Sequence, residues 1–316
     1  MEALAGILVA DFTRYLPGPF ASREFLDRGA RVVRVETPEG DPLRSVAPGW
    51  DAALNAGKES VVWDLERDPE LGRELCARAD VVLEGFRPGV TERLGIGAAD
   101  VPESVVYCSI TGFGATDQRA GHDLNYLGWA GLLDDTAPAL PPIPIADLAG
   151  GALYAVVEIL TALLERERTG RGKHITVSMT HNAHRLGAHR LVGEPERTLT
   201  GGLACYGIYE AADGRFLTIT PVEPKFWQRL CEVIGREDLV ERHYEQDQPA
   251  LAAELADVFR TRPLADWLEL FGGQDVMAGP VATLAEAAAW LGETPAAGPA
   301  PGLGEHTERW RASFEG

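Results

Sequence analysis

Four residues of this sequence carry side chains that can move protons, and each stands where a helix is expected to begin. His122 and Asp123 are adjacent in "RAGHDLNYLGWAG". Asp147 precedes the glycines of "ADLAGG", and Glu223 precedes a proline in "TPVEPKFW". Imidazoles and carboxylates are the usual general acids and bases of enzymes. Loops and helix starts are also where α/β folds collect their chemistry, so these residues are candidates for one acid–base site.

Each candidate also has a simpler structural interpretation. A lone histidine before a helix is more often a hydrogen-bonded structural residue than a catalyst. Asp147 can be only a helix cap or a first-turn acid stabilised by the helix dipole, and Glu223 only an acid that leads its helix. In the catalytic alternative, Gly150 and Gly151 permit close backbone approach, and free amides at the helix start hold an oxyanion of a carbonyl compound. The residues alone leave both interpretations open.

Several common reaction classes lack their motifs in this sequence. The opening strand–helix–strand pattern suggests dinucleotide binding, with Glu36 at the end of the second strand, but "TRYLPGPF" has no glycine fingerprint and its prolines remove amide donors. No P-loop, G-x-S-x-G or H-E-x-x-H sequence is found. The four cysteines form no metal-ligand cluster, so we expect no metal site and interpret them as buried small hydrophobic residues.

Composition limits the partners that the chain can have. The formal net charge of −19 over 316 residues argues against nucleic acid, which needs a clustered cationic face. No run of about 18 uninterrupted apolar residues and no basic leader are present, so we expect no membrane association and a cytoplasmic location. An anionic small molecule is compatible with the basic side chains that gather in the first third of the chain: Arg14, Arg23, Arg28, Arg31, Arg34, Arg44, Lys58, Arg87 and Arg93.

Strand and helix patterns alternate over about the first 115 residues. Short β-branched runs predict strands at 6–12, 31–38, 60–65, 80–86 and 104–114, and the segments between three pairs of them predict helices at 17–30, 68–79 and 88–95. Alternating strands and helices imply a parallel sheet with right-handed crossovers. We therefore predict an α/β fold of the doubly wound type for this part.

The pattern of predicted elements changes in the rest of the chain. Apolar residues at helical spacing predict a long helix from about 146 that ends at Gly170 or Gly172, followed by a strand at 174–179. A hairpin at 206–219 and helices at 223–235, 250–262 and 264–273 then indicate a smaller α+β domain.

The motifs along the chain resemble those of the class III CoA-transferase family, also called CaiB/BaiF, and most of all its α-methylacyl-CoA racemase branch. The resemblance runs nearly end to end, through "LPGPFASREFLDRGARVVRVETPEGDPLR", "NAGKESVVWDL", "DVVLEGFRPGVTERLG", "AGHDLNYLGWAG", "ADLAGG" and "YGIYEAADGRFLTI". It implies a Rossmann-like large domain, a smaller domain and an interlocked homodimer. We accordingly expect a large domain at 1–186 completed by 287–316, a linker at 187–200 and a small domain at 201–286.

The resemblance also supplies a ligand for the basic residues. Members bind acyl-CoA thioesters, and coenzyme A carries a pyrophosphate and a phosphorylated adenosine. Arg34, Arg44, Lys58 and Arg87 stand at family-motif positions, so we expect them to contact the nucleotide. Coenzyme A enters as part of the substrate, and no other cofactor is expected.

The family's branches differ in how they use the acidic position. In transferases the aspartate of the "ADLAGG" position is a covalent nucleophile, whereas in racemases it is one of two bases, and the histidine of "AGHD" is typical of racemases. The resemblance thus implies an acyl-CoA epimerase that inverts the α-carbon of a 2-methyl-branched thioester by 1,1-proton transfer through an enolate. His122 and Asp147 would exchange the acid and base roles, with Asp123 and Glu223 orienting them.

Two alternatives remain. One is a CoA-transferase that uses Asp147 as its nucleophile, and the other is a non-catalytic acyl-CoA-binding protein. The racemase hypothesis has a requirement of its own, because isolated histidine and aspartate side chains differ by roughly 2.6 pKa units. Desolvation of Asp147 would reduce that difference, whereas the helix dipole would increase it.

Overall fold

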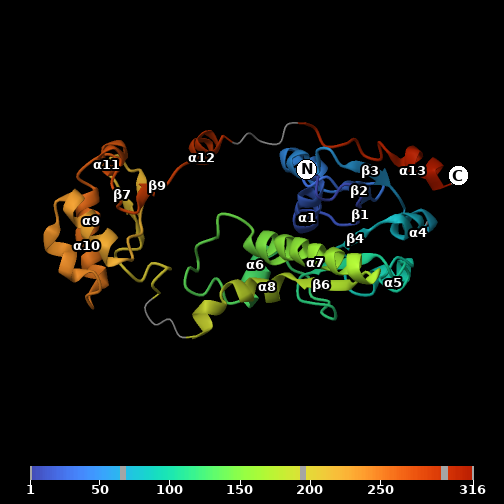
Figure 1. Cartoon of the computed structure of the whole chain (residues 1–316), viewed down its shortest axis with the longest axis horizontal. Coiled ribbons are helices and arrows are strands. Elements are labelled where there is room, and N and C mark those ends of the chain that lie inside the picture. Colours follow the sequence, from blue (N-terminus) through green and yellow to red (C-terminus); the bar gives the residue numbers. More distant parts are fainter. Residues whose placement is uncertain (1, 65–68, 193–196, 293–297, 315–316) are drawn as a thin grey trace. The chain divides into compact units, whose positions relative to one another are not determined.

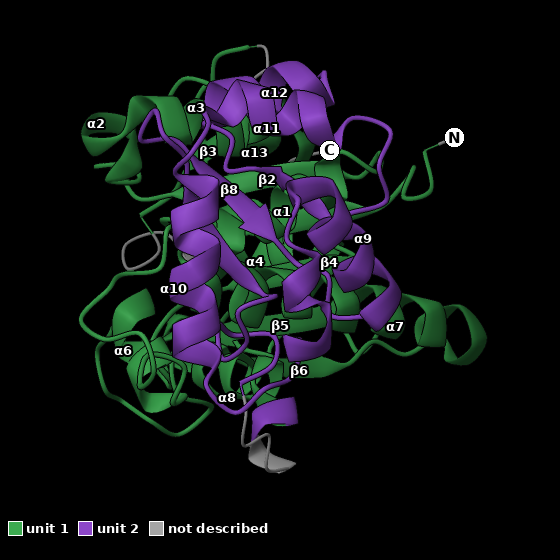
Figure 2. Ribbon diagram, turned by 90° about the vertical axis from the view of Figure 1, so that its left-hand side faces the viewer, with its two compact units in different colours: residues 1–188, 295–316 green, residues 189–294 purple. Residues whose placement is uncertain are grey.

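The chain forms two compact units in the computed structural model, which describes residues 2–64, 69–192, 197–292 and 298–314. Unit 1 comprises Met1–Ala188 and Pro295–Gly316, and unit 2 comprises His189–Thr294 (Figures 1 and 2). Most of the predicted linker at 187–200 therefore belongs to unit 2, and the predicted boundary at 287 falls inside a helix of unit 2. Residues 193–196 of that linker lie outside the described residues, as do 293–297 and 315–316 of the C-terminal segment.

Unit 1 is built on a six-stranded parallel sheet with the strand order β3-β2-β1-β4-β5-β6. The strands are β1 (Leu8–Asp11), β2 (Arg31–Glu36), β3 (Glu59–Val62), β4 (Val81–Glu84), β5 (Val106–Thr111) and β6 (His174–Ser178). Val9 of β1 pairs with Val32 on one side and Val81 on the other. The chain fills one half of the sheet before it returns to start the other, so the topology switches between β1 and β4. The predicted doubly wound α/β fold is confirmed.

Helices cover both faces of this sheet, as buried parallel strands require. Those of unit 1 are α1 (Pro17–Leu26), α2 (Leu43–Val46), α3 (Pro48–Asn55), α4 (Pro69–Arg78), α5 (Val90–Leu94), α6 (Asp123–Trp129), η1 (Ala146–Leu153), α7 (Tyr154–Thr169), α8 (Met179–Leu186) and α13 (Thr307–Phe314). Phe25 of α1 and Ile159 of α7 belong to the core of one face. Leu75 of α4 and Trp310 of α13 belong to the core of the other.

The C-terminal segment returns to unit 1 and lies against β3. Its Gly304 and His306 N–H groups donate to the Oγ and the carbonyl oxygen of Ser60, each at 2.9 Å. The N–H of Val62 in turn donates to Thr307 Oγ1 at 3.0 Å. Since β3 is an edge strand of the sheet, the segment satisfies backbone and side-chain groups that the edge would leave open.

The long helix predicted from about residue 146 is present, but its first eight residues form the π-helix η1, and α7 continues it to Thr169. It ends as predicted, because Gly170 takes a left-handed φ of 70° and caps it. The two alanines on the buried face of α7 let the helix approach the sheet closely. The residues of this face are Ala155, Val156, Ile159, Ala162 and Leu163.

The continuous helix Ala146–Thr169 is long and apolar enough to cross a membrane by length and composition. It is nevertheless a core helix of unit 1, because η1 packs against α1 and α8 while α7 packs against β5 and β6.

Unit 2 combines a small antiparallel sheet with helices. Its elements are η2 (Ala188–Val192), β7 (Gly207–Glu210), β8 (Phe216–Ile219), α9 (Pro224–Ile234), η3 (Glu237–Arg242), α10 (Gln248–Phe259), α11 (Leu264–Phe271), β9 (Ala278–Pro280) and α12 (Leu284–Leu291), with η2 beginning at the border. The strand order is β7-β8-β9, and Trp227, Leu255 and Trp267 are buried in its core. The predicted hairpin and its three following helices are confirmed. All four cysteines are free and buried, as predicted.

Candidate active site

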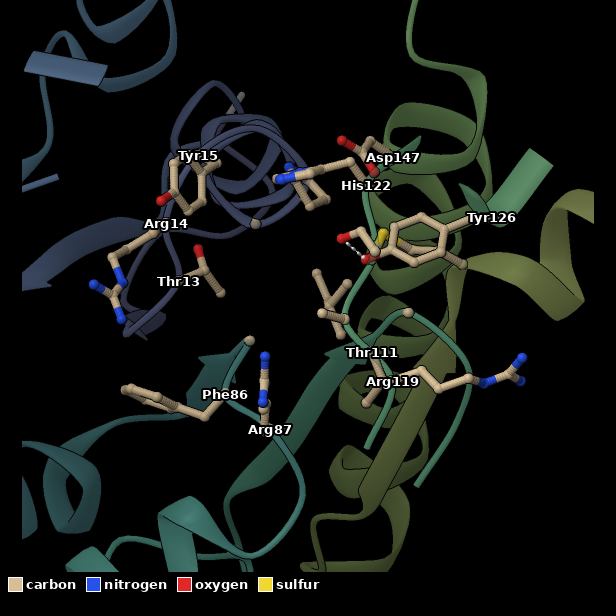
Figure 3. A pocket seen from close by; sticks show the side chains of 18 of the residues that line it. Thr13, Arg14, Tyr15, Phe86, Arg87, Thr111, Arg119, His122, Tyr126 and Asp147 are labelled. Atoms are coloured by element: carbon tan, nitrogen blue, oxygen red, sulfur yellow. Dashed lines mark hydrogen bonds between the residues drawn. The ribbon is translucent and has the colours of Figure 1, made fainter. Parts of the chain in front are cut away.

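A cavity of about 640 Å³ lies at the switch point of the unit 1 sheet. Its walls come from the segment after β1, the segment after β4, the end of β5, the segment that leads into α6, and the starts of η1 and α8 (Figure 3). In open α/β sheets, ligands bind at the carboxyl ends of the strands where the strand order reverses. The position of the cavity alone therefore marks it as the candidate active site.

His122 lines this cavity and also starts a helix. Its backbone N–H donates to Asn125 Oδ1 at 3.0 Å, which fixes the first turn of α6. The carbonyl of the preceding residue, Gly121, accepts the Tyr126 hydroxyl at 2.5 Å (dashed in Figure 3). The imidazole is exposed to the cavity, so the structural and the chemical interpretations of His122 do not exclude each other.

Asp147 lines the same cavity from the first turn of η1. Its side chain is partly buried, and this desolvation, reinforced by the negative charge of Asp123, raises the pKa of its carboxyl to about 7. The result is close to the ordinary pKa of an imidazole in general, about 6.5.

Asp123 is not among the residues that line the cavity, but it contacts Asp147. Its Oδ1 accepts the backbone N–H of Asp147 at 3.0 Å, which ties the start of α6 to the start of η1. The same carboxylate thus holds Asp147 in place and raises its pKa.

Two of the amides at this helix start, which the catalytic alternative would use for an oxyanion, have partners within the protein. The N–H of Asp147 is taken by Asp123, and that of Leu148 donates to the carbonyl of Pro144 at 3.0 Å. The two glycines have a packing role instead. A Cβ on Gly150 would lie 2.7 Å from the carbonyl oxygen of Met179, and one on Gly151 would lie 2.9 Å from the Met179 side chain. They let α8 pack against η1.

Glu223 belongs to unit 2, where it occupies the N-cap position of α9 and is exposed. Every residue that lines the cavity belongs to unit 1. The structure thus brings together His122, Asp123 and Asp147, and the role of Glu223 beside them stays a prediction.

Two arginines that face the cavity have no carboxylate partner among the described residues. Arg87, for which a contact with the nucleotide is predicted, follows β4, and Arg14 follows β1. Both side chains are exposed, and within the described part of the chain neither forms an ion pair. Arg14 is one of the basic residues of the first third of the chain, and its place directly after the first strand was a usable signal for a ligand contact.

A third arginine of the cavity, Arg119, is already engaged. Its guanidinium pairs with Asp117 at 2.8 Å and lies over the rings of Phe113 and Trp129, at 4.2 and 4.5 Å from their centroids. Arg119 therefore acts as a fixed part of the cavity wall.

The predicted nucleotide contact of Arg34 is corrected by the structure. This side chain is 0 % exposed, and its guanidinium lies 2.8 Å from Asp51, 3.3 Å from Asp41 and 3.4 Å from Glu36. A ligand outside unit 1 does not reach it in this conformation. Its charge serves the interior, where a buried guanidinium requires carboxylate partners.

Lys58 is corrected for the same reason. It is 3 % exposed, and its ammonium donates to Pro19 O, Ser22 Oγ and Asn55 Oδ1 at 2.7–2.9 Å. Burial lowers the pKa of this lysine to about 8. All three ammonium protons are used inside the unit, so the predicted contact with coenzyme A is not available.

Arg44 is less buried than Arg34 and Lys58. It pairs with Glu36 at 2.6 Å and donates to the carbonyl of Pro301 in the C-terminal segment at 2.9 Å. Its side chain is partly exposed. The predicted contact with the nucleotide remains a prediction for Arg44 and for Arg87.

Comparison with known proteins adds an independent observation. The sequence profile of CoA-transferase family III matches residues 4–307. The chain is 34% identical to human alpha-methylacyl-CoA racemase over 309 residues, which cover 90% of this chain and 79% of that protein. It is 33% identical to the acetyl-CoA:oxalate CoA-transferase of Acetobacter aceti over 319 residues, which cover 90% and 82%. The chain belongs to CoA-transferase family III.

The fold of this family III protein agrees with that of solved relatives. The crystal structure of Rv3272 from Mycobacterium tuberculosis superposes with a TM-score of 0.84 at 29% identity and covers 97% of this chain and 98% of that one. A CaiB/BaiF family protein from Brucella suis gives a TM-score of 0.81 at 29% identity over 98% of both chains. Both racemases and CoA-transferases are thus among its relatives, at nearly equal identity.

Proposed function

We propose that this family III protein is an acyl-CoA epimerase that inverts the α-carbon of a 2-methyl-branched thioester. The observation that carries the proposal is the raised pKa of Asp147, about 7, in the same cavity as His122. A carboxylate of ordinary pKa is a weak base for a carbon acid. With a pKa near 7, the same group accepts a proton more strongly and also carries one at neutral pH.

The proposed reaction needs one proton shared between the two side chains. In one direction, ionised Asp147 removes the α-proton of the thioester, an enolate forms, and protonated His122 returns a proton to the opposite face of the carbon. In the other direction, neutral His122 is the base and protonated Asp147 is the acid. The raised pKa of Asp147 lets this carboxyl serve as the base in one direction and as the acid in the other. A proton leaves and a proton returns, so coenzyme A as part of the substrate is the only cofactor that the proposal includes.

Arg14 and Arg87 support the acyl-CoA part of the proposal. Phosphate groups need cations, and these two guanidinium groups face the cavity without partners among the described residues. We propose that they contact the phosphate-bearing portion of the ligand.

The alternative is a CoA-transferase in which Asp147 is the covalent nucleophile. The 33% identity to a CoA-transferase supports it. The raised pKa of Asp147 counts against it, because a nucleophilic carboxylate must be ionised and this one is partly protonated at neutral pH. The third candidate, an acyl-CoA-binding protein without activity, shares the cavity but needs no titrating pair.

The test uses each enantiomer of a 2-methylacyl-CoA incubated with the full chain in deuterium oxide. We expect deuterium at the α-carbon and formation of the opposite enantiomer from both starting forms. The Asp147→Asn variant serves as the control and should slow epimerisation at least about 100-fold. No exchange and no inversion over a panel of acyl chains would contradict the proposal.

The alternatives give different signals in companion experiments. A transferase incubated with an acyl-CoA, a free acid and hydroxylamine acquires a mass change at Asp147, which the epimerase does not. A binding protein shows neither exchange nor that mass change, yet its melting temperature rises with acyl-CoA.

A further inference from the structure

Tyr15 has an unusual backbone conformation in the wall of the cavity. Its φ is 65°, in the left-handed region that aromatic residues rarely adopt. Its side chain is 49% exposed and lines the cavity (Figure 3). Such a conformation persists only where the surrounding structure holds it, and it concentrates at ligand sites. Contacts in the surrounding structure must therefore hold Tyr15 in this conformation.

The cause is a buried carboxylate. The N–H of Tyr15 donates to Asp41 Oδ2 at 3.0 Å, and the other oxygen of Asp41 accepts the N–H of Leu43 at 2.8 Å. Asp41 is 2% exposed, and Arg34 faces it at 3.3 Å. The charge cluster that withdraws Arg34 from the surface thus fixes the backbone of Tyr15.

The residues on either side of Tyr15 are fixed as well. Asp11 Oδ1 accepts both the N–H and the hydroxyl of Thr13, at 2.9 and 2.5 Å. At Gly18, an added Cβ would lie 1.9 Å from Thr13 Oγ1, so the start of α1 packs directly on this loop. The backbone between β1 and α1 is thus held at Thr13 and Tyr15, which fixes the direction in which the Tyr15 side chain leaves the chain.

The orientation of Tyr15 suggests its use. In Figure 3 the ring stands between Arg14 and His122, and the imidazole of His122 points toward that side of the cavity. The Tyr15 ring therefore lines the space next to His122, where the proposed reaction places the reacting carbon. We propose that Tyr15 is a specificity-determining residue whose ring limits the size of the acyl group beside the reacting carbon. The substrate class in this inference rests on the proposed function.

The test compares a thioester with a short 2-methyl-branched acyl chain and one whose 2-methyl-branched chain ends in an aromatic ring. Tyr15→Ala should raise the kcat/KM ratio of the bulky over the short substrate about tenfold, because it opens the wall. Tyr15→Phe keeps the ring and should leave the ratio within about twofold. A ratio that stays unchanged in Tyr15→Ala would overturn the inference, and so would an equal change in Tyr15→Phe.

Tyr15→Gly provides a second variant that is expected to fold, since glycine adopts this φ without strain. The same ratio is measured for the dissociation constants of the two thioesters by calorimetry, which needs no turnover. Absence of α-proton exchange in the wild-type protein defeats the proposed function but leaves this binding ratio to be tested. An unchanged binding ratio in Tyr15→Gly defeats the inference about Tyr15 whether or not the protein is an epimerase.

Asp41 is the positioning residue in this inference. Asp41→Ala should change the substrate ratio in the same direction as Tyr15→Ala although Tyr15 is intact, and Asp41→Asn, which keeps an oxygen acceptor for the Tyr15 N–H, should restore it. A role in stability alone would lower the melting temperature and leave the ratio as it was, which would contradict the positioning role.

Discussion

Asp147 has its high pKa from two causes that can be separated by mutation. One is partial burial, and the other is the charge of Asp123. Asp123→Asn removes the charge and keeps an oxygen that can accept the Asp147 N–H. We expect the acidic limb of the kcat/KM–pH profile for epimerisation to move to lower pH, because the pKa of Asp147 falls. An acidic limb that stays in place would show that Asp123 does not act electrostatically.

The same pKa predicts how stability depends on pH. The folded protein keeps a proton on Asp147 up to about pH 7, whereas the unfolded chain releases it near the ordinary value of 3.8. The free energy of unfolding contributed by this group is therefore fully present below about pH 3.8 and is lost as pH rises through 7. The asparagine of the Asp147→Asn variant does not titrate. From pH 5 to pH 8, the free energy of unfolding of this variant should therefore rise by about 1–3 kcal/mol relative to that of the wild type. Denaturant unfolding of both proteins at pH 5 and at pH 8 measures this change. If the stability difference between the variant and the wild type is the same at both pH values, the raised pKa of Asp147 is contradicted.

Two of the four acid–base candidates, His122 and Asp147, line one cavity, and Asp123 hydrogen-bonds to Asp147. The sequence could indicate them because motifs and helix starts are local signals. It failed for Arg34 and Lys58, for which motif position indicated a ligand contact but not burial. Their partners include Asp51 for Arg34 and Ser22 for Lys58, which come from segments whose positions only the tertiary structure sets. The left-handed φ of Tyr15 was equally out of reach, since its acceptor lies 26 residues further along the chain.

The helix η1 depends on a close contact with α8. Gly150→Ala would place a Cβ 2.7 Å from a backbone carbonyl, so one of the two elements must shift. We expect a loss of about 1–3 kcal/mol in the free energy of unfolding, together with lower activity, since Asp147 is on the same helix. Gly128→Ala in α6 is the matched control, because a Cβ there meets nothing within 4 Å. If chemical denaturation gives the same stability for both variants, the close packing of η1 is not required.

Elements with a strong repeat were predictable, and short ones were not. The six strands of unit 1 and the long helix carry β-branched runs or apolar spacing. The π-helical start of that helix has the same apolar composition as an α-helix, so no sequence pattern distinguished it. The short α8 was missed because Ser178, assigned to the preceding strand, ends that strand and also caps the helix.

At the scale of the whole molecule, unit 1 depends on the C-terminal segment. A chain that stops after residue 297 loses the contacts of Gly304, His306 and Thr307 with the β3 edge. It also loses Trp310 from the core on one face of the sheet. We expect a clear fall in melting temperature, several degrees at least. Thr307→Ala, which removes one acceptor, should have a much smaller effect. A truncated chain that melts like the full one would show that the segment only rests on the sheet.

The assembly and location of the protein stay predictions. We propose the homodimer that the family resemblance implies, and sedimentation equilibrium should then give twice the mass of the chain. A monomer at micromolar concentration would contradict it. The cytoplasmic location and the part that Glu223 plays are open to the same kind of direct measurement.

The central claim is that His122 and Asp147 serve opposite faces of one carbon. Its most direct test is α-proton exchange in deuterium oxide, measured separately for each enantiomer with His122→Ala and with Asp147→Asn. Both variants should lose epimerisation, yet each should keep exchange with the one enantiomer whose proton its remaining base removes, and the two variants should keep opposite enantiomers. Retention of the same enantiomer by both, or epimerisation that persists in either, would contradict the account.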